Sequence, residues 1–290
     1  MVFEVERKRF ESMIRATSVD GAVRVVEMVF KPTYMYAVNM DDANVVMSYA
    51  KFPKHFFAKY GVDRVVSVAI DSERVLKILR SMKGDTVKVE KSAEEVQLST
   101  EKEKVSIPLM EQGEFKLPNF AELDENDNLK IKDLHPTVRA RIPVLKKELE
   151  SLGIERTTFT VDGGVLYVEQ SSEDGYKFST KIADVGSVED GSYMFDTNYL
   201  KKIFGSVIMS EVVVLLGKDC PLIVVDRTND YTLNFFLARL VIGEEVEEVE
   251  EVKEEVSGVS TEVSEEQEEV GEGGEIEDEI TKELLEEGED

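Results

Sequence analysis

Cysteine, histidine and tryptophan are almost missing from this chain of 290 residues, which has one Cys, two His and no Trp. Cys220 cannot close an intrachain disulfide, and no second thiol or histidine cluster stands near it to suggest zinc. Cys220 is expected to be a buried packing thiol, and His55 and His135 to be ordinary surface or core residues rather than catalytic groups. We therefore predict a reducing compartment, no metal site and no cofactor.

Long apolar runs are also absent, since no stretch approaches the roughly 20 residues that a membrane-spanning helix needs. Met1 leads directly into a strand-like Val2–Val5, without the basic and apolar pattern of a signal peptide. We therefore expect an intracellular protein without a membrane partner, in the cytoplasm of a prokaryote or the nucleus of a eukaryote.

Catalytic constellations are missing as well. Asp41 and Asp42 could pass for a carboxylate pair, but adjacent residues on a turn point in different directions, and no matching base or phosphate loop accompanies them. Gly163 and Gly164 are interpreted as a hairpin turn, not as a nucleotide-binding motif. The chain is predicted not to be an enzyme.

Negative charge is concentrated at the C-terminal end. Residues 244–290 hold 23 acidic and 2 basic residues, and residues 1–243 hold the other 38 acidic and 33 basic residues. The end segment lacks aromatics and has too little apolar surface to offset the entropy of ordering, so we expect a disordered acidic tail. It serves either for solubility or to repel acidic partner segments and attract basic ones.

The body of the chain contains two copies of one unit. The segments VAIDSERVLKIL (68–79) and YMFDTNYLKKIF (193–204) share an apolar strand end, an Asp-Ser or Asp-Thr helix cap and a short amphipathic helix. Two further helices are predicted over residues 7–17 and 143–153, where apolar residues recur at helical spacing. Each copy therefore has the order helix, strands, helix, strands.

This repeat predicts an N-terminal domain over residues 1–110 and a C-terminal domain over residues 137–243. Between them, residues 111–136 contain Pro118, Pro136 and acidic, Asn-containing turn chemistry without sustained periodicity. We interpret this stretch as the interdomain connector.

All four predicted helices carry basic residues although the chain is acidic. Those expected to include phosphate-facing groups are Lys8, Arg15, Lys77, Arg80, Lys146, Lys147, Lys201 and Lys202. Positive charge gathered on one surface suits duplex DNA, because phosphate neutralisation releases counterions and needs no base-edge chemistry. The alternative is that Lys and Arg are good helix formers that decorate solvated faces.

Several segments, in this order along residues 1–242, together resemble archaeal and eukaryotic DNA sliding clamps of the proliferating cell nuclear antigen (PCNA) family. They are VFEVERKRFESMIRA near the N-terminus, residues 34–50, 68–90 and 220–241, and the internal repeat. Residues 40–45 are similar to the family's Met-Asp-x-x-His-Val turn, and Cys220-Pro221-Leu222 with Leu237-Ala238 to its x-Pro-Leu and Leu-Ala-Pro segments. Asn44 stands where the family usually has His, and Arg239 where it usually has Pro.

The resemblance implies an α+β DNA clamp fold. Two similar domains would each place antiparallel sheets outside and two helices inside, and three subunits would close a ring. It implies a DNA polymerase processivity factor for replication and repair, which encircles duplex DNA without sequence preference. Polymerase, clamp loader, ligase and nuclease would bind through short peptide motifs. A clamp-like adaptor or checkpoint scaffold stays open as the alternative, as do homotrimer and heterotrimer.

The resemblance also implies two protein-contact surfaces. Subunits would join through edge strands over residues 104–110 and 175–182. Their expected interface residues are Val105, Ile107, Leu109, Tyr176, Phe178 and Ile182. A hydrophobic partner-binding pocket is expected from Met40, Asn44, Val45, Met47, Leu117, Phe120, Leu123, Pro221, Leu237, Ala238 and Arg239. Arg239 would add a positive rim that favours partners with an acidic flank.

Overall fold

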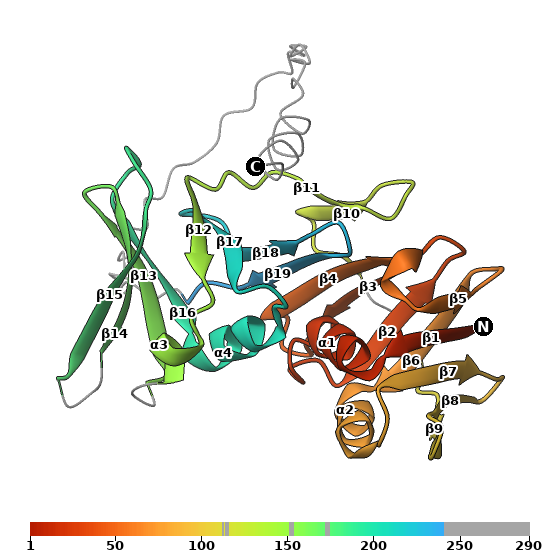
Figure 1. The fold of residues 1–290 in the computed structure, drawn as a ribbon. Helices are drawn as coiled ribbons and strands as arrows, with labels where there is room; N and C mark the ends of the chain where they lie inside the picture. The colour runs from red at the N-terminus through yellow and green to blue at the C-terminus, as the bar shows by residue number, and fades with distance from the viewer. Residues whose placement is uncertain (112, 114–115, 151–153, 172–174, 241–290) are drawn as a thin grey trace, which may run out of the picture. The chain divides into compact units, whose positions relative to one another are not determined.

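The computed structural model describes residues 1–111, 113, 116–150, 154–171 and 175–240. The chain divides into two units, residues 1–242 and 243–290, and every described helix and strand lies in the first (Figure 1). The predicted acidic tail lies outside the described residues. The boundaries drawn at residues 110 and 136 between domains and connector stay predictions.

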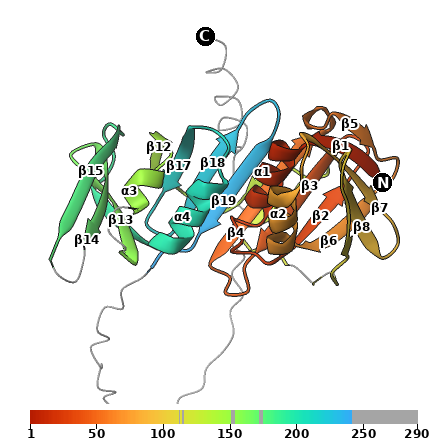
Figure 2. The same cartoon turned by 60° about the horizontal axis from the view of Figure 1, so that its bottom comes forward.

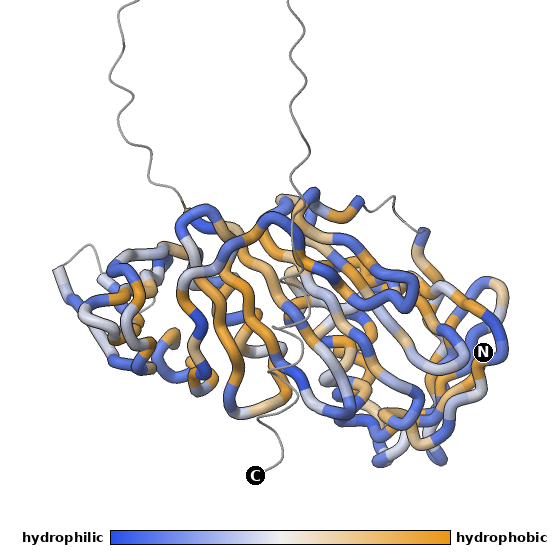
Figure 3. Tube along the Cα trace, turned by 90° about the horizontal axis from the view of Figure 1, so that it is seen from above, coloured by the Kyte–Doolittle hydropathy of each residue, from blue (hydrophilic) through white to orange (hydrophobic). Residues whose placement is uncertain are grey.

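An antiparallel sheet of eight strands is the centre of the first unit, in the order β12-β17-β18-β19-β4-β3-β2-β6. Its strands are β2 (Val25–Phe30), β3 (Tyr34–Met40), β4 (Val46–Pro53), β6 (Val66–Asp71), β12 (Val138–Pro143), β17 (Glu211–Leu216), β18 (Leu222–Arg227) and β19 (Thr232–Leu237). The two sequence repeats meet where β19 pairs with β4, from Thr232 opposite Lys51 to Leu237 opposite Val46. Hydrophobic residues run along its middle strands, as expected for a sheet covered on both faces (Figure 3).

Each repeat adds a second antiparallel sheet. The N-terminal one has the order β5-β1-β7-β8-β9, and the C-terminal one has the order β15-β14-β13-β16. The strands are β1 (Val2–Glu6), β5 (Lys59–Gly61), β7 (Thr86–Lys91), β8 (Glu95–Ser99), β9 (Lys104–Pro108), β13 (Arg156–Asp162), β14 (Val165–Ser171), β15 (Lys177–Asp184) and β16 (Gly191–Asp196). Strands β9 and β15 each stand last in their sheet, so each has one edge without a neighbour among the described strands.

The helices agree with the sequence prediction except for the third. They are α1 (Arg7–Thr17), α2 (Ser72–Ser81), α3 (Lys146–Glu150) and α4 (Thr197–Ser206), with a 3-10 turn η1 at Lys54–Phe56. The predicted caps are confirmed, because the Asp71 carboxylate accepts from the Arg74 amide and the Asp196 carboxylate from the Asn198 amide. The prediction that a helix starts at residue 143 is wrong: β12 continues to Pro143, since residues 138–143 alternate buried and exposed and pair with β17. Residues 151–153 of that prediction lie outside the described residues.

The four helices lie in a row on one side of the eight-stranded sheet (Figure 2). Helix α1 contacts both α2 and α4, and α3 contacts α4. Apolar side chains at helical spacing, such as Phe10 and Ile14 of α1 and Leu200 and Phe204 of α4, are buried in the inner core between helices and sheet. The expected arrangement of helices on one side of antiparallel sheets is therefore confirmed.

The connector contains a small hairpin that the sequence prediction missed. Strands β10 (Ala121–Leu123) and β11 (Leu129–Ile131) pair with each other, and the Asp124 carboxylate closes the turn by accepting from the Asn126 and Asn128 amides at 2.8 Å. Strands of three residues are too short for an alternating pattern to stand out in a sequence. The hairpin covers the face of the central sheet that is turned away from the helices, because its apolar residues pack with Met47, Ile223 and Phe236 there.

Candidate functional site

The helix row carries exposed positive charge. Lys8 on α1 and Lys146 and Lys147 on α3 are exposed, and Lys201 and Lys202 on α4 are half-buried. Among the described helices the Phe side chains are buried, and the half-buried Tyr199 is bound through its hydroxyl to Asp41, so the chemistry suits a phosphate backbone rather than base stacking with single-stranded nucleic acid. Their contact with DNA stays a prediction.

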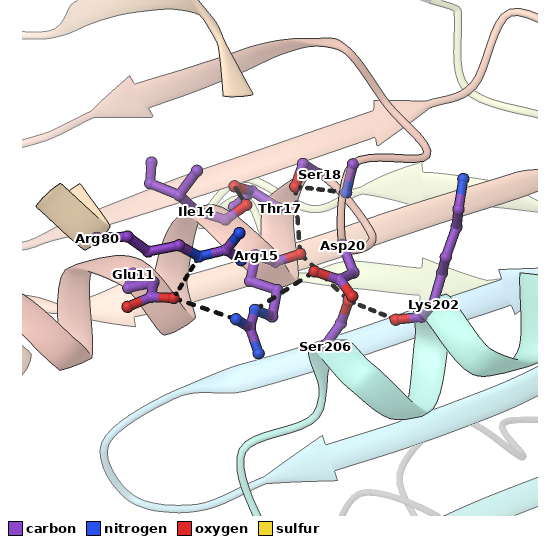
Figure 4. A network of polar contacts seen from close by, with 10 residues as sticks. Glu11, Ile14, Arg15, Thr17, Ser18, Asp20, Arg80, Lys202 and Ser206 are labelled. Atoms are coloured by element: carbon purple, nitrogen blue, oxygen red, sulfur yellow. Dashed lines mark hydrogen bonds and ion pairs between the residues drawn. The ribbon is translucent and has the colours of Figure 1, made fainter. Parts of the chain in front are cut away.

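Three other predicted phosphate-facing residues are held by carboxylates of the chain itself. Glu11 accepts from Arg15 and from Arg80, each at 3.1 Å, and Glu73 accepts from Lys77 at 2.6 Å. The Arg15 Nε also lies 3.4 Å from an Asp20 carboxylate oxygen, an ion pair without hydrogen-bond geometry (Figure 4). The positive charge of these residues is thus partly neutralised within the subunit.

A hydrogen-bonded junction joins the helix rows of the two repeats. The Ser206 hydroxyl at the end of α4 lies 3.2 Å from the Arg15 carbonyl of α1 and 2.7 Å from the Lys202 carbonyl (Figure 4). Ser206 is buried, so this contact is shielded from water. It fixes α1 and α4 against each other at the middle of the row.

The opposite face of the central sheet carries a hydrophobic cluster, here called the outer cluster. It consists of Met47, Ala121, Ile223 and Phe236, with Val38, Met40, Leu117, Phe120, Leu129, Ile131, Leu134, Leu215 and Val225 packed against them. Four predicted partner-binding residues, Met40, Met47, Leu117 and Phe120, therefore come together here. Met47 is buried, so it forms the floor of the cluster rather than its surface. Leu123, at the end of β10, and Pro221, before β18, are half-buried.

The orientation predicted for Leu237 is wrong. Its side chain is 0% exposed and belongs to the inner core, because successive residues of a strand point to opposite faces. Its neighbour Phe236, which the sequence prediction missed, faces the outer cluster, where its ring centre lies 5.7 Å from that of Phe120. The alternation along β19 was the signal that could have identified Phe236.

The turn between β3 and β4 lies against the C-terminal segment. The Ala238 amide donates to the Val45 carbonyl at 2.9 Å, which joins two predicted partner-binding segments. Asn44 is exposed and has φ of 55°, a left-handed conformation that Asn tolerates. Ala238 is exposed, and Val45 is half-buried against the inner core.

Arg239 is held at the edge of this surface by two contacts. Its guanidinium donates to the Lys218 carbonyl, and its central carbon lies 5.9 Å from the centre of the Tyr193 ring. These contacts hold the Arg239 guanidinium at the edge of the predicted partner-binding pocket, where a positive rim is expected. Its effect on partner choice stays a prediction.

One polar contact of this surface has no signal in the sequence. The Tyr199 hydroxyl of α4 donates to an Asp41 carboxylate oxygen at 2.6 Å, across 158 positions of the chain. The other oxygen of Asp41 accepts from the Val45 and Val46 amides at 2.8 and 2.9 Å. The hydrogen bond to Asp41, followed by burial, raises the pKa of Tyr199 to about 12.

The two sheet edges predicted to join subunits, at β9 and β15, differ in what they offer. On β9, Ile107 is 1% exposed and packs in the inner core opposite Val96, so its predicted role as a side-chain interface contact is wrong. Val105 and Leu109 are half-buried. At the other edge Tyr176 precedes β15 and is 70% exposed. Phe178 and Ile182 on β15 are half-buried.

Within the described part of the chain, no three His, Cys, Asp or Glu side chains gather to hold a metal ion. None of the described helices is long and apolar enough to cross a membrane.

Cys220 is buried as predicted, and burial raises the pKa of its thiol. Gly163 and Gly164 form the predicted hairpin turn, with φ of 56° and 80°.

No family model matches the chain, and no curated protein matches its sequence. Solved structures do match its fold. A structure of the C-terminal region of FEN-1 bound to A. fulgidus PCNA has 16% identity and a TM-score of 0.69, over 84% of this chain and 99% of that one. A PCNA2–PCNA3 complex from Sulfolobus tokodaii has 16% identity and a TM-score of 0.67, over 82% of this chain and 99% of that one. PCNA from Thermococcus kodakaraensis has 21% identity and a TM-score of 0.66, over the same shares. The chain therefore has the predicted fold of the PCNA sliding clamps.

Proposed function

We propose that this chain is one subunit of a ring-shaped sliding clamp, a non-enzymatic processivity factor that encircles duplex DNA and tethers polymerase, ligase, nuclease and repair partners. The observation that carries the proposal is the row of four helices on one side of the central sheet, with Lys8, Lys146 and Lys147 exposed on it. Basic side chains on a rigid surface can contact phosphates of any sequence, and a closed ring needs no tight contact to stay on DNA.

Ring closure would pair two sheet edges that have no neighbour among the described strands, β9 of one subunit and β15 of the next. An unpaired edge strand is a template for strand addition across chains. Val105 and Leu109 on one side and Tyr176, Phe178 and Ile182 on the other would supply apolar contacts. The S. tokodaii structure holds two clamp chains in one complex, which supports assembly between chains of this fold.

Placing an aspartate at Phe178 tests this interface. The Phe178→Asp chain should sediment as a monomer, because a desolvated carboxylate at a strand interface has no partner. Phe159→Tyr is the matched control for a fault in folding, since Phe159 is buried in β13, which lies two strands from β15 in the same sheet. Retention of the wild-type oligomer by Phe178→Asp contradicts the interface.

Partner proteins would dock on the outer cluster and the adjoining C-terminal segment. The cluster presents half-buried apolar side chains, Met40, Leu117 and Phe120, around a buried floor, which suits aliphatic and aromatic anchors of a short peptide. The A. fulgidus clamp binds the C-terminal region of FEN-1, which supports short-peptide docking for this chain too. Arg239 would favour peptides with an acidic flank, and a clamp loader would use the same surface.

DNA-dependent loading measured over a range of salt concentrations tests the clamp function. A clamp stays on circular DNA and leaves linear DNA. A variant with alanine at Lys8, Lys146, Lys147, Lys201 and Lys202 should show a weaker dependence of DNA affinity on salt, with the slope smaller by roughly one unit per lost phosphate contact.

A second candidate function is a clamp-like adaptor that acts mainly through proteins. It is favoured by the internal pairing of Arg15, Arg80 and Lys77 with carboxylates of the chain itself. Loss of all DNA association even at low salt identifies the adaptor.

A further inference from the structure

Tyr199 occupies a position between the two proposed binding surfaces. It lies in the first turn of α4, two and three residues before Lys201 and Lys202. Its ring is half-buried, and its hydroxyl leaves the helix to reach Asp41 at 2.6 Å. The helix cap does not need this hydroxyl, because Asp196 already closes the first turn through its own carboxylate. The phenol is therefore available for a role outside α4.

The carboxylate of Asp41 organises the turn between β3 and β4. One of its oxygens accepts from the Val45 and Val46 amides, and the Asn44 amide donates to the Asp41 carbonyl at 3.0 Å. Asp41 is buried, so each of its oxygens needs a donor from the protein. The Tyr199 hydroxyl donates to the second oxygen, and this bond fixes the plane of the carboxylate that holds both amides.

This turn is continuous with the proposed partner surface. Met40 immediately precedes it and packs in the outer cluster, and the Val45 carbonyl accepts from Ala238 of the C-terminal segment. A shift of the Asp41 carboxylate would therefore move the end of β3 and the attachment of residue 238 together. Both are segments that a docked peptide would contact.

We propose that Tyr199 is a positioning residue for the partner-binding surface, acting through Asp41 on the turn formed by residues 41–46. The inference rests on the proposed function for the identity of that surface. The phenol orients the carboxylate, the carboxylate holds two turn amides, and the turn holds the C-terminal segment. DNA contact by Lys201 and Lys202 does not depend on the hydroxyl, because the helix cap is intact without it and Lys202 lies 5.9 Å from the centre of the ring, which Phe would keep.

The variant Tyr199→Phe removes the hydroxyl and keeps the ring. Tyr60→Phe is its matched control, because the Tyr60 hydroxyl also makes short hydrogen bonds, at 2.8 Å to the Lys31 and Tyr34 carbonyls, but far from the turn in sequence and contacts. The probe is a synthetic peptide of the FEN-1 C-terminal region. Its affinity for the full-length protein is measured by calorimetry, together with amide hydrogen exchange of residues 41–46 and the salt slope of DNA binding.

The expected result is that Tyr199→Phe weakens the peptide about tenfold, the usual consequence of losing one hydrogen bond to a charged group, and speeds amide exchange at Val45 and Val46. Tyr60→Phe should change neither, and both variants should keep the wild-type salt slope for DNA. A purely structural role of Tyr199 would instead lower stability and alter DNA binding along with peptide binding.

Unchanged exchange at Val45 and Val46 in Tyr199→Phe overturns the proposal, whether or not the peptide binds. Failure of the wild-type protein to bind the peptide counts against the proposed docking function alone, because the exchange experiment still decides whether Tyr199 positions the turn. Equal weakening of the peptide by Tyr60→Phe also overturns the proposal, since the effect would then not be specific to the turn.

Discussion

Replacing Lys51 should release the connector hairpin from the central sheet. Lys51 on β4 donates to the Asn126 carbonyl at 2.7 Å and to the Asn128 side-chain oxygen at 2.6 Å, both in the β10–β11 turn. Its ammonium also lies 4.3 Å from the centre of the Tyr34 ring. Lys51→Met keeps the apolar stem of the side chain and removes its ammonium with all three contacts, so the variant isolates their contribution.

The magnitude follows from these contacts. Hydrogen bonds to a charged donor contribute about 1.5 to 3 kcal/mol each when shielded, and a cation–π contact about 0.5 to 1 kcal/mol at an exposed site. Lys51 is only half-buried, so solvent screens a large part of this sum, and burial lowers the pKa of its ammonium, which means that desolvation opposes the contacts. We expect about 2 kcal/mol for hairpin docking, or roughly a 30-fold rise in the population of the detached hairpin.

Amide hydrogen exchange at Leu129 and Ile131, which pair with Leu123 and Ala121 across the hairpin, measures this population directly. The matched control is Lys59→Met, which removes a lysine whose ammonium pairs with Glu4 at the surface, away from the hairpin. Faster exchange in the hairpin with Lys51→Met, and no change with Lys59→Met, is the expected outcome. Equal exchange in both variants would show that the outer cluster and the contacts of Asp127 with Tyr34 and Tyr49 hold the connector without Lys51, which would refute the reasoning.

Three further predictions concern charge. The buried Asp226 carboxylate accepts from the Ile208 and Met209 amides and from the Tyr231 hydroxyl. Asp226→Leu leaves these donors without an acceptor and should lower the free energy of unfolding, measured by urea titration, by about 3 kcal/mol or more. Asp226→Asn keeps an acceptor and should lower it by less than about 1 kcal/mol. Burial raises the pKa of Asp226, so wild-type stability should fall as pH rises through that pKa, a dependence that Asp226→Asn abolishes. Burial and the hydrogen bond to Asp127 raise the pKa of Tyr34 from 10.0 to about 12. The contribution of this bond to hairpin stability is therefore complete below pH 10 and lost as pH rises to 12. Amide exchange of the hairpin in Tyr34→Phe should lack this pH-dependent step. Glu11→Gln removes the carboxylate charge beside Arg80 and one of the two beside Arg15, which keeps Asp20, so the salt slope of DNA binding should increase by about 1 to 2. An unchanged slope would mean that neither guanidinium faces phosphate.

The sequence predicts those elements whose signals are local. Helix α1 has the predicted bounds because Phe10, Met13 and Ile14 repeat at helical spacing, and the caps of α2 and α4 follow from Asp71 and Asp196 at the strand ends. The start of α3 was misplaced because Pro143 suits the first turn of a helix as well as the end of a strand, and only its pairing with Glu211 distinguishes the two.

The candidate site was less predictable because it depends on contacts between distant segments. The face to which Leu237 points is set by the register of β19 against β18 and β4, and the burial of Ile107 by its pairing with Val96 of β8. A shift of one residue would reverse each of these orientations. The contact between Tyr199 and Asp41 joins two repeats, and neither residue stands in a local pattern that requires the other.

The central sheet would allow one subunit to carry the two proposed binding surfaces without competition between them. Along β19, Phe235 and Leu237 point to the helix side, and Phe236 between them points to the outer cluster. The proposed DNA surface and the proposed partner surface are thus separated by the thickness of one sheet, and alternate residues of the same strand support each. A substitution such as Phe236→Ala should therefore weaken the outer cluster and leave the helix row in place. Leu237→Ala, one residue further, opens a cavity beneath the helices and should destabilise the whole subunit.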